Sequence, residues 1–286
     1  MLLLTQMKEF RKKVMVMKVF YAKILVMLFT FAAFIGVTSG NAFAEGVPDW
    51  SRNVIRATAI GVYPPNAVSH LQAVAMAKTA AKRIAERDLL VAINGINIDS
   101  DTTVENMIAT SDIIRTKVHG FLKGAVEVAS RELDGGYEVT MEVPIFGGSN
   151  SLAQVVMPAP AVKETFPTPT VNVQVSGGYT GVIVDCRGLG LKPVMSPVIK
   201  NDSGQPIYGY KNLDPDKVIA NGMASYSNST SSGVERAGSN PIIVRAVSLE
   251  GVYRGNPVIS TADANKILSE NNHSHFLEAT NVVFVR

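Results

Sequence analysis

The chain has 286 residues, of which 47% are apolar and 18% are charged, which is the balance of a globular protein and excludes a disordered one. Its 27 basic and 24 acidic residues give a formal net charge of +3. A single cysteine excludes an internal disulfide, so each domain must be held together by its apolar core. The length has room for two ordinary domains.

The first segment of the chain has the pattern of an export signal. Residues 24–37 (ILVMLFTFAAFIGV) form an uncharged apolar run behind Lys18 and Lys23. Ala42 and Ala44 occupy the small-residue positions that signal peptidase reads, so we expect residues 1–44 to be cleaved before Glu45. The run is shorter than the roughly 20 residues of a spanning helix, so we expect no integral membrane span after cleavage.

The expected leader also carries the excess positive charge. It holds six of the 27 basic and one of the 24 acidic residues, which leaves 21 basic and 23 acidic side chains and a net charge of −2. Phosphate-backbone binding needs a concentrated basic surface, so we expect no nucleic-acid partner. Translation from Met1, Met15 or Met17 stays open, because a leader that begins at Met17 has a more typical length.

Residues 45–148 are expected to form an N-terminal α+β domain. An apolar run over residues 54–62, stopped by two prolines, predicts a strand. Residues 66–95 are rich in Ala, Leu, Lys, Arg and Glu, with apolar residues at helical spacing, and predict a long helix that ends at Gly95.

Two further stretches complete this domain. Side chains suited to N-caps predict one broken helix or two short helices, with the caps at Thr102 or Thr103 and at Ser111 or Asp112. Residues 125–146 alternate apolar and polar side chains on either side of a DGG turn, which predicts a β-hairpin. The hairpin is expected to offer its core Val126, Val128, Val139, Met141 and Val143.

Residues 149–170 are rich in proline and predict an extended, semi-rigid linker between the domains, with the alternative that the segment lies along the surface of one domain. Residues 171–286 are expected to form a C-terminal α+β domain with a mostly β core. The expected strands include residues 171–175, 181–185, 194–200 and the final apolar run, and the last helix is capped by Ser260 or Thr261. The predicted fold class is α+β, with two small domains that each combine helices with an antiparallel sheet.

Three segments of the N-terminal half carry a family resemblance: AKTAAKRIAERDLLVAINGINIDSDTTVENMI, VHGFLKGAVEV and DGGYEVTMEVPI. Over residues 53–145 the chain resembles bacterial lipoproteins of the Lpp-twenty type and the N-terminal domain of the flagellar assembly protein FlgT. This resemblance implies an exported, non-enzymatic envelope component, and it brings no catalytic residues with it. The chain lacks the lipid-accepting cysteine of the lipoproteins. Its C-terminal half resembles that of uncharacterised exported proteins.

Residues 180–197 (TGVIVDCRGLGLKPVMSP) have the composition of an active-site loop. A strand there ends in a carboxylate, a thiol and a cation, and the following glycines and lysine complete the set Asp185, Cys186, Arg187, Gly188, Gly190 and Lys192. A thiolate nucleophile needs a base, and none of the four histidines has motif spacing to Cys186, so we prefer a small buried side chain there.

The charged residues of this loop have two interpretations. Asp185 and Arg187, two apart, are expected to form an ion pair that braces the turn. Alternatively, Asp185, Arg187 and Lys192 with Gly188 and Gly190 bind an anion or a carboxylate. The glycines match neither a phosphate loop nor a dinucleotide fingerprint, so no cofactor and no catalytic residue is predicted.

A second cluster of chemistry-bearing residues lies near the end of the chain. His273 and His275, with Glu270 and Glu278, have the side chains of a metal site, but two histidines on a polar turn are more often solvated, and we predict no metal.

Two functions from different classes follow from the sequence. The first is a scaffold or assembly factor in the periplasm or on the periplasmic face of the outer membrane, acting through contacts with envelope proteins, in a flagellar or a general envelope role. The alternative is a periplasmic small-ligand binder or hydrolase that uses residues 185–192. The sequence leaves the oligomeric state open.

Overall fold

The computed structural model describes residues 46–157, 162–171, 173–231 and 233–286. The predicted signal peptide and its cleavage site lie outside the described residues. The chain combines helices with sheets that contain antiparallel pairs, in the α+β class that the sequence predicted. Among the described helices, none combines the length and the hydropathy needed to cross a membrane.

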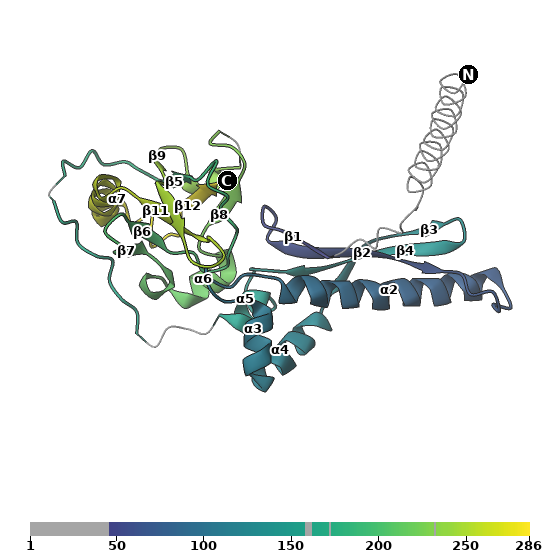
Figure 1. Cartoon of the computed structure of the whole chain (residues 1–286). Coiled ribbons are helices and arrows are strands. Elements are labelled where there is room, and N and C mark those ends of the chain that lie inside the picture. Colours follow the sequence, from purple (N-terminus) through teal and green to yellow (C-terminus); the bar gives the residue numbers. More distant parts are fainter. Residues whose placement is uncertain (1–45, 158–161, 172, 232) are drawn as a thin grey trace, which may run out of the picture. The chain divides into compact units, whose positions relative to one another are not determined.

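The first part of the chain is a four-stranded antiparallel sheet with a long helix along one face (Figure 1). The strands lie in the order β1-β2-β4-β3, and each neighbour runs in the opposite direction. The bounds are β1 (Val47–Asp49), β2 (Val54–Val62), α2 (His70–Asn94), β3 (Val126–Leu133) and β4 (Gly136–Pro144). The predicted strand at residues 54–62, the long helix and the hairpin are all confirmed.

Helix α2 is capped by Ser69, whose side chain accepts a hydrogen bond from the backbone N–H of Gln72. Its buried face is mostly alanine, at Ala73, Ala77, Ala81 and Ala85. Because these side chains are small, the helix axis can approach the sheet closely. The helix and the sheet then pack into one core.

The predicted caps resolve into two separate helices, α3 (Val104–Thr110) and α4 (Asp112–Leu122). Thr103 caps α3 in a reciprocal capping box with Asn106, and Ser111 caps α4. A short helix, α5 (Leu152–Val156), follows the hairpin and buries Leu152, Ala153 and Val156.

The predicted core of the hairpin is right for β4 and wrong for β3. Val139, Met141 and Val143 are buried, whereas Val126 and Val128 are 59% and 45% exposed. Strand β3 lies at the edge of the sheet, and an irregularity between Glu127 and Ala129 interrupts its pairing with β4. The side chain that β3 directs at α2 is therefore Glu127, which contacts two lysines of the helix.

The second part of the chain contains two further four-stranded sheets. One has the order β10-β11-β6-β7 and the other β8-β12-β5-β9. The strands are β5 (Gly181–Asp185), β6 (Ile199–Asn201), β7 (Pro206–Tyr208), β8 (Ser225–Ser227), β9 (Pro241–Arg245), β10 (Ser248–Glu250), β11 (Asn256–Ile259) and β12 (Val282–Val285). The helices are η1 (Tyr210–Asn212), α6 (Pro215–Asn221), η2 (Glu235–Ala237) and α7 (Thr261–Ser274).

The expectation of antiparallel pairing is right for two of the three strand pairs in the first of these sheets, in which β11 and β6 run parallel, and it is wrong for the second sheet. Strands β8, β12, β5 and β9 are all parallel to their neighbours. The residues between paired strands, including α6 and α7, are long enough to return the chain to the same end of the sheet, as parallel pairing requires. Ser260 is the cap of α7, as predicted.

Two predicted strands are wrong or shortened. The described residues of 171–175 form no strand, and only Ile199–Asn201 of the segment 194–200 pairs in a sheet. The backbone N–H of Val194 donates to the hydroxyl of Tyr226, and those of Met195 and Ser196 donate to backbone carbonyls of residues 97 and 98. These donors are therefore not available to a sheet ladder.

The described residues form a single compact unit, and one buried apolar cluster runs through it from Ile55 to Phe284. The N-terminal and C-terminal regions meet through backbone hydrogen bonds as well. Met195 N donates to Asn97 O at 3.0 Å, and Gly147 N donates to Ile219 O at 3.1 Å. The loops at residues 96–101 and 146–148 therefore join the two regions directly.

Candidate functional site

The predicted loop lies at the carboxyl edge of the parallel sheet. Asp185 ends β5 and pairs in register with Val285 of β12 on one side and with Arg245 of β9 on the other. Cys186 and Arg187 follow it directly. The carboxyl edge of a parallel sheet is the place where α/β folds most often bind ligands, so this position alone keeps the loop a candidate.

Cys186 is fully buried and faces the main apolar core. Its surroundings raise the pKa of the thiol to about 12, because burial disfavours the thiolate and the charge of Asp185 adds to the effect. The contact of its Sγ atom is with the carbonyl of Val184, at 3.7 Å. The geometry favours the prediction of a small buried side chain over that of a nucleophile.

Asp185 and Arg187 form the ion pair that their spacing predicted. The Nε atom of Arg187 lies 2.8 Å from Oδ1 of Asp185, and Nη2 lies 2.6 Å from Oδ2. This two-pronged contact lowers the pKa of the carboxyl, and the nearby charge of Arg245 lowers it further. The pair braces the turn. To bind a ligand, either side chain would first have to break its contact with the other.

The rest of this loop is a tight turn. Gly188 and Gly190 have φ angles of +80° and +76°, a region that favours glycine. Leu189 O accepts a hydrogen bond from Nη2 of Arg254 at 2.7 Å, and Lys192 is exposed. Glycine here serves backbone conformation, and ligand binding by Asp185, Arg187, Gly188, Gly190 and Lys192 stays a prediction.

The carboxylate of Glu270 does not face the two histidines. It is buried and accepts hydrogen bonds from the backbone N–H groups of Ser176 and Gly177, at 2.7 and 3.0 Å. His275 ends α7 in the left-handed conformation and contacts Glu278. Within the described residues, no three side chains of His, Cys, Asp or Glu gather in a way that could hold a metal ion.

Glu270 is one of several groups that hold the segment after the predicted linker. We call residues 163–171 and 173–179 the connector strap. Asn265 of α7 accepts hydrogen bonds from the backbone and the hydroxyl of Thr170, and Asn212 donates to Thr165 O. Phe166 stacks on Tyr208 with 6.4 Å between ring centroids. The strap therefore lies along the C-terminal region, which was the alternative interpretation of this sequence.

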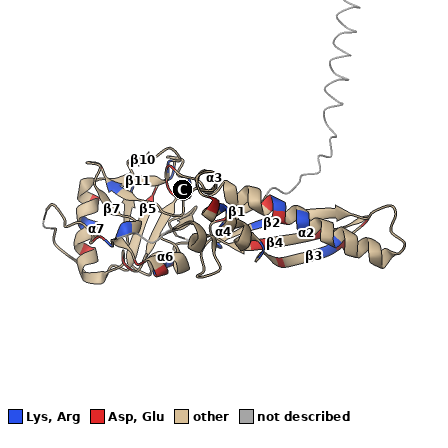
Figure 2. Cartoon of the chain, turned by 90° about the horizontal axis from the view of Figure 1, so that it is seen from below, with Lys and Arg blue, Asp and Glu red and all other residues tan. Residues whose placement is uncertain are grey.

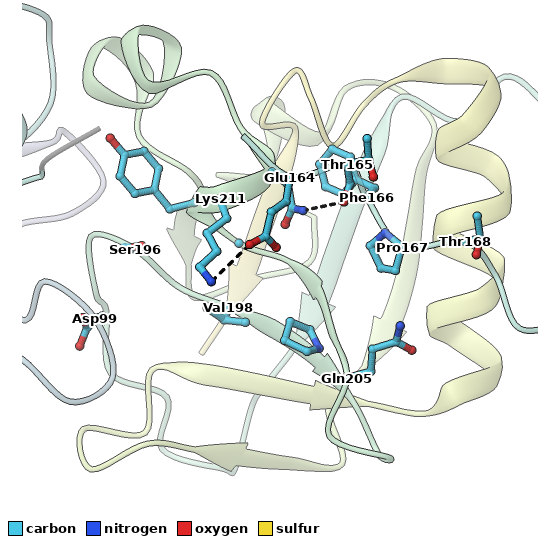
Figure 3. A pocket seen from close by; sticks show the side chains of 14 residues that line it. Asp99, Glu164, Thr165, Phe166, Pro167, Thr168, Ser196, Val198, Gln205 and Lys211 are labelled. Carbon is cyan, nitrogen blue, oxygen red and sulfur yellow. Dashed lines mark hydrogen bonds and ion pairs between the residues drawn. The ribbon is translucent and has the colours of Figure 1, made fainter. Parts of the chain in front are cut away.

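A cavity of about 730 Å³ opens beside the strap (Figure 3). Its walls come from the strap, from residues 205–212 around β7 and η1, and from Asp99 and Ser196. Figure 3 shows Glu164 and Lys211 facing one another, with Asp99 and Ser196 to one side and Pro167, Thr168 and Gln205 to the other. The Lys211 Nζ atom lies 3.4 Å from the Glu164 carboxylate.

Sequence reasoning did not find this cavity. Its three charged residues, Asp99, Glu164 and Lys211, are separated along the chain and match no motif. The one signal that could have drawn attention to it is the aromatic residue between prolines in the strap, because Phe166 and Pro167 form part of the wall.

The match to a known family begins at the first residue of β5. Residues 181–286 match the family model of the second domain of Treponema pallidum Tp0624. This Tp0624-like region holds both C-terminal sheets and α7, and it starts ten residues after the predicted start of the C-terminal domain. A search of curated proteins found no match. The resemblance of residues 53–145 to the Lpp-twenty type stays a prediction.

Proposed function

We propose that this chain is an exported, non-enzymatic protein of the bacterial cell envelope, a scaffold or assembly factor that binds other envelope proteins. The apolar leader and the resemblance of residues 53–145 support export to the periplasm or to the periplasmic face of the outer membrane. The likeness of residues 181–286 to a domain of a Treponema protein supports a bacterial source.

One observation carries the proposal: the face of the N-terminal sheet opposite α2 has no described element against it (Figure 1). We call this surface the open face. Ile60, Val62 and Val126 lie on it and are 50%, 74% and 59% exposed. Ile60 and Val62 lie together at the end of β2, whereas Val126 lies beside the Arg56–Glu142 pair, so exposed apolar side chains alternate with paired polar ones on this face. This mixture on an uncovered sheet supports a surface to which another protein binds.

The polar groups of the open face are already paired across the strands. Arg56 and Glu142 form an ion pair at 2.6 Å, Arg131 and Glu138 form another at 2.6 Å, and the hydroxyls of Thr58 and Thr140 lie 2.8 Å apart. Figure 2 shows basic and acidic segments interleaved along α2 and these strands. A partner can therefore cover the face without burying an unpaired charge.

Site-specific photocrosslinking in living bacteria tests the proposal. A photoreactive amino acid at Ile60 or Ala129 of the open face should trap an envelope protein. The Thr58→Lys substitution should abolish that crosslink, because a lysine there places an unpaired charge at the contact. A probe at Leu71, which is 80% exposed on α2, is the matched control and should give no such product.

Two results would contradict the proposal. One is a strain lacking the protein that keeps every envelope and motility phenotype while open-face probes trap no envelope protein. The other is equal crosslinking from Leu71 and from the open face, which would indicate random encounter.

The alternative, a periplasmic ligand binder or hydrolase at residues 185–192, has weaker support. Arg187 is engaged by Asp185, and the thiol of Cys186 is buried. A hydrolase would need a nucleophile and a base within hydrogen-bond reach of one another.

A further inference from the structure

The cavity beside the connector strap has walls that are held in place without any ligand. Glu164 N donates to Lys211 O at 2.8 Å, and the side chain of Asn212 donates to Thr165 O at 3.1 Å. The stacking of Phe166 on Tyr208 also holds the strap in place. A volume of about 730 Å³ lies within the usual range of small-molecule sites.

The charged groups of the cavity interact only weakly with each other. The Glu164 and Lys211 side chains are 56% and 72% exposed, and an ion pair with that exposure contributes little to stability. Asp99 uses its Oδ1 atom to accept the backbone N–H groups of Asp101 and Thr102, and Oδ2 has no hydrogen-bond partner among the described residues. The carboxylates can therefore turn to an incoming cation.

The charges of the lining favour a cationic group. Asp99 and Glu164 carry one negative charge each and Lys211 one positive charge, so the lining has a net charge of −1. Hydroxyl and amide side chains at Thr165, Thr168, Ser196 and Gln205 surround these charges and can bond a polar body. Phe166, Pro167 and Pro206 add apolar surface for its carbon skeleton.

We infer that this cavity binds a small molecule that carries a primary ammonium group on a body rich in hydroxyl or amide groups. The Glu164 carboxylate accepts hydrogen bonds from the ammonium group, and the negative charge of Asp99 adds to the attraction. The threonine, serine and glutamine side chains form hydrogen bonds with the rest of the molecule. An amino sugar and a short peptide both have this chemistry. The inference is independent of the proposed scaffold role, because the open face and the cavity share no residue.

Calorimetric titration of the purified chain with two pairs of probes tests the inference. The first pair is glucosamine and N-acetylglucosamine, which share a ring and differ in the ammonium group. The second pair is glycylglycine and its N-acetylated form. We expect the amine of at least one pair to bind saturably and acetylation to weaken it about tenfold or more, because a hydrogen bond between charged groups is lost.

Two substitutions in the cavity test the role of Glu164 and distinguish an amino sugar from a short peptide as the ligand. Glu164→Gln should weaken every ammonium probe by about the same factor as acetylation. Lys211→Gln removes a competing ammonium and a partner for a ligand carboxylate, so it should leave glucosamine binding equal or stronger and should weaken glycylglycine. Glu86→Gln, which breaks an exposed ion pair with Arg83 on α2, is the matched control and should change neither.

The inference is overturned if neither amine binds saturably at millimolar concentration. It is equally overturned if each amine and its acetylated form bind alike, or if Glu164→Gln binds the amine as tightly as the unchanged chain. Thermal unfolding of each variant shows whether it is folded before it is titrated.

Discussion

Gly61 of β2 lies so close to Ala77 of α2 that a Cβ atom at Gly61 would stand 2.0 Å from the carbonyl oxygen of Ala77. No side chain fits in that space without moving the backbone of the helix or of the strand. We therefore expect Gly61→Ala to destabilise the fold by about 1–3 kcal/mol, the usual cost of overpacking. Urea unfolding followed by circular dichroism measures the change.

Gly120 provides the control for this prediction. It lies within α4, and a Cβ atom there would meet nothing within 4 Å. Gly120→Ala should stabilise the chain by up to about 1 kcal/mol, because alanine favours a helix over glycine. Equal stability of the two variants would mean that α2 and β2 are not packed this closely.

The carboxylate of Glu127 links β3 to α2 through Lys78 and Lys82, at 2.8 and 2.7 Å. These lysines hold its pKa at about 2, below its unfolded value. A lowered pKa stabilises the fold above the unfolded value, and the contribution is lost as the pH falls from about 4.5 towards 2. Glu127→Gln should therefore unfold with a flatter pH dependence over this window.

The effect of Glu127→Gln at neutral pH should be small. We expect a loss of at most about 1 kcal/mol, because both lysines are partly exposed and solvent screens the pairs. Thermal unfolding of both chains between pH 2 and pH 7 gives the comparison. Parallel curves would show that Glu127 does not titrate with a lowered pKa.

The thiol of Cys186 should be inert in the folded chain. Burial keeps it protonated, with its pKa raised to about 12, and a protonated thiol does not attack alkylating reagents. At pH 8 a thiol reagent should label the chain in denaturant and leave the native chain almost unlabelled, as mass spectrometry would show. Rapid labelling of the native chain would reopen the nucleophile interpretation of this residue.

Arg236 of η2 links two segments, residues 221–222 and Thr280, at the amino end of the parallel sheet. Its guanidinium donates to the carbonyls of Asn221, Gly222 and Thr280, at 2.8, 2.6 and 2.7 Å. Lysine carries its three donors on one nitrogen, so it does not reproduce the contacts that Arg236 makes from Nε and Nη2 of its planar guanidinium. We expect Arg236→Lys to destabilise the fold by about 2–3 kcal/mol.

Arg83 is the control for Arg236, since its side chain is 77% exposed. Arg83→Lys should leave the midpoint of urea unfolding unchanged within error. If the two lysine variants unfold at the same urea concentration, Arg236 does not hold these segments together.

Features of the fold that depend on residues close together in the chain could be predicted from the sequence. Thr103, Ser111 and Ser260 cap helices as predicted, because a cap and its partner lie within three residues of each other. The Asp185–Arg187 pair was predictable for the same reason. Spacing along the chain alone brings such groups together.

Strand direction and the ends of strands depend on distant partners. Val182 pairs with Val282, one hundred residues away. The residues of neither strand indicate that the two strands run parallel. The segment 194–200 has the composition of a strand, yet Met195 and Ser196 donate to the N-terminal region. Tertiary contacts supplied better partners for those N–H groups than a ladder would.

The sequence by itself predicted the export signal. It also determined the α+β class, the long helix, the caps at Thr103, Ser111 and Ser260, and the brace between Asp185 and Arg187, because each depends on neighbours in the chain. The tertiary structure alone decided that β8, β12, β5 and β9 run parallel, that Val126 faces outward, and that Asp99, Glu164 and Lys211 share one cavity. Those outcomes require groups far apart in the sequence to meet, and only the packed core specifies which of them do.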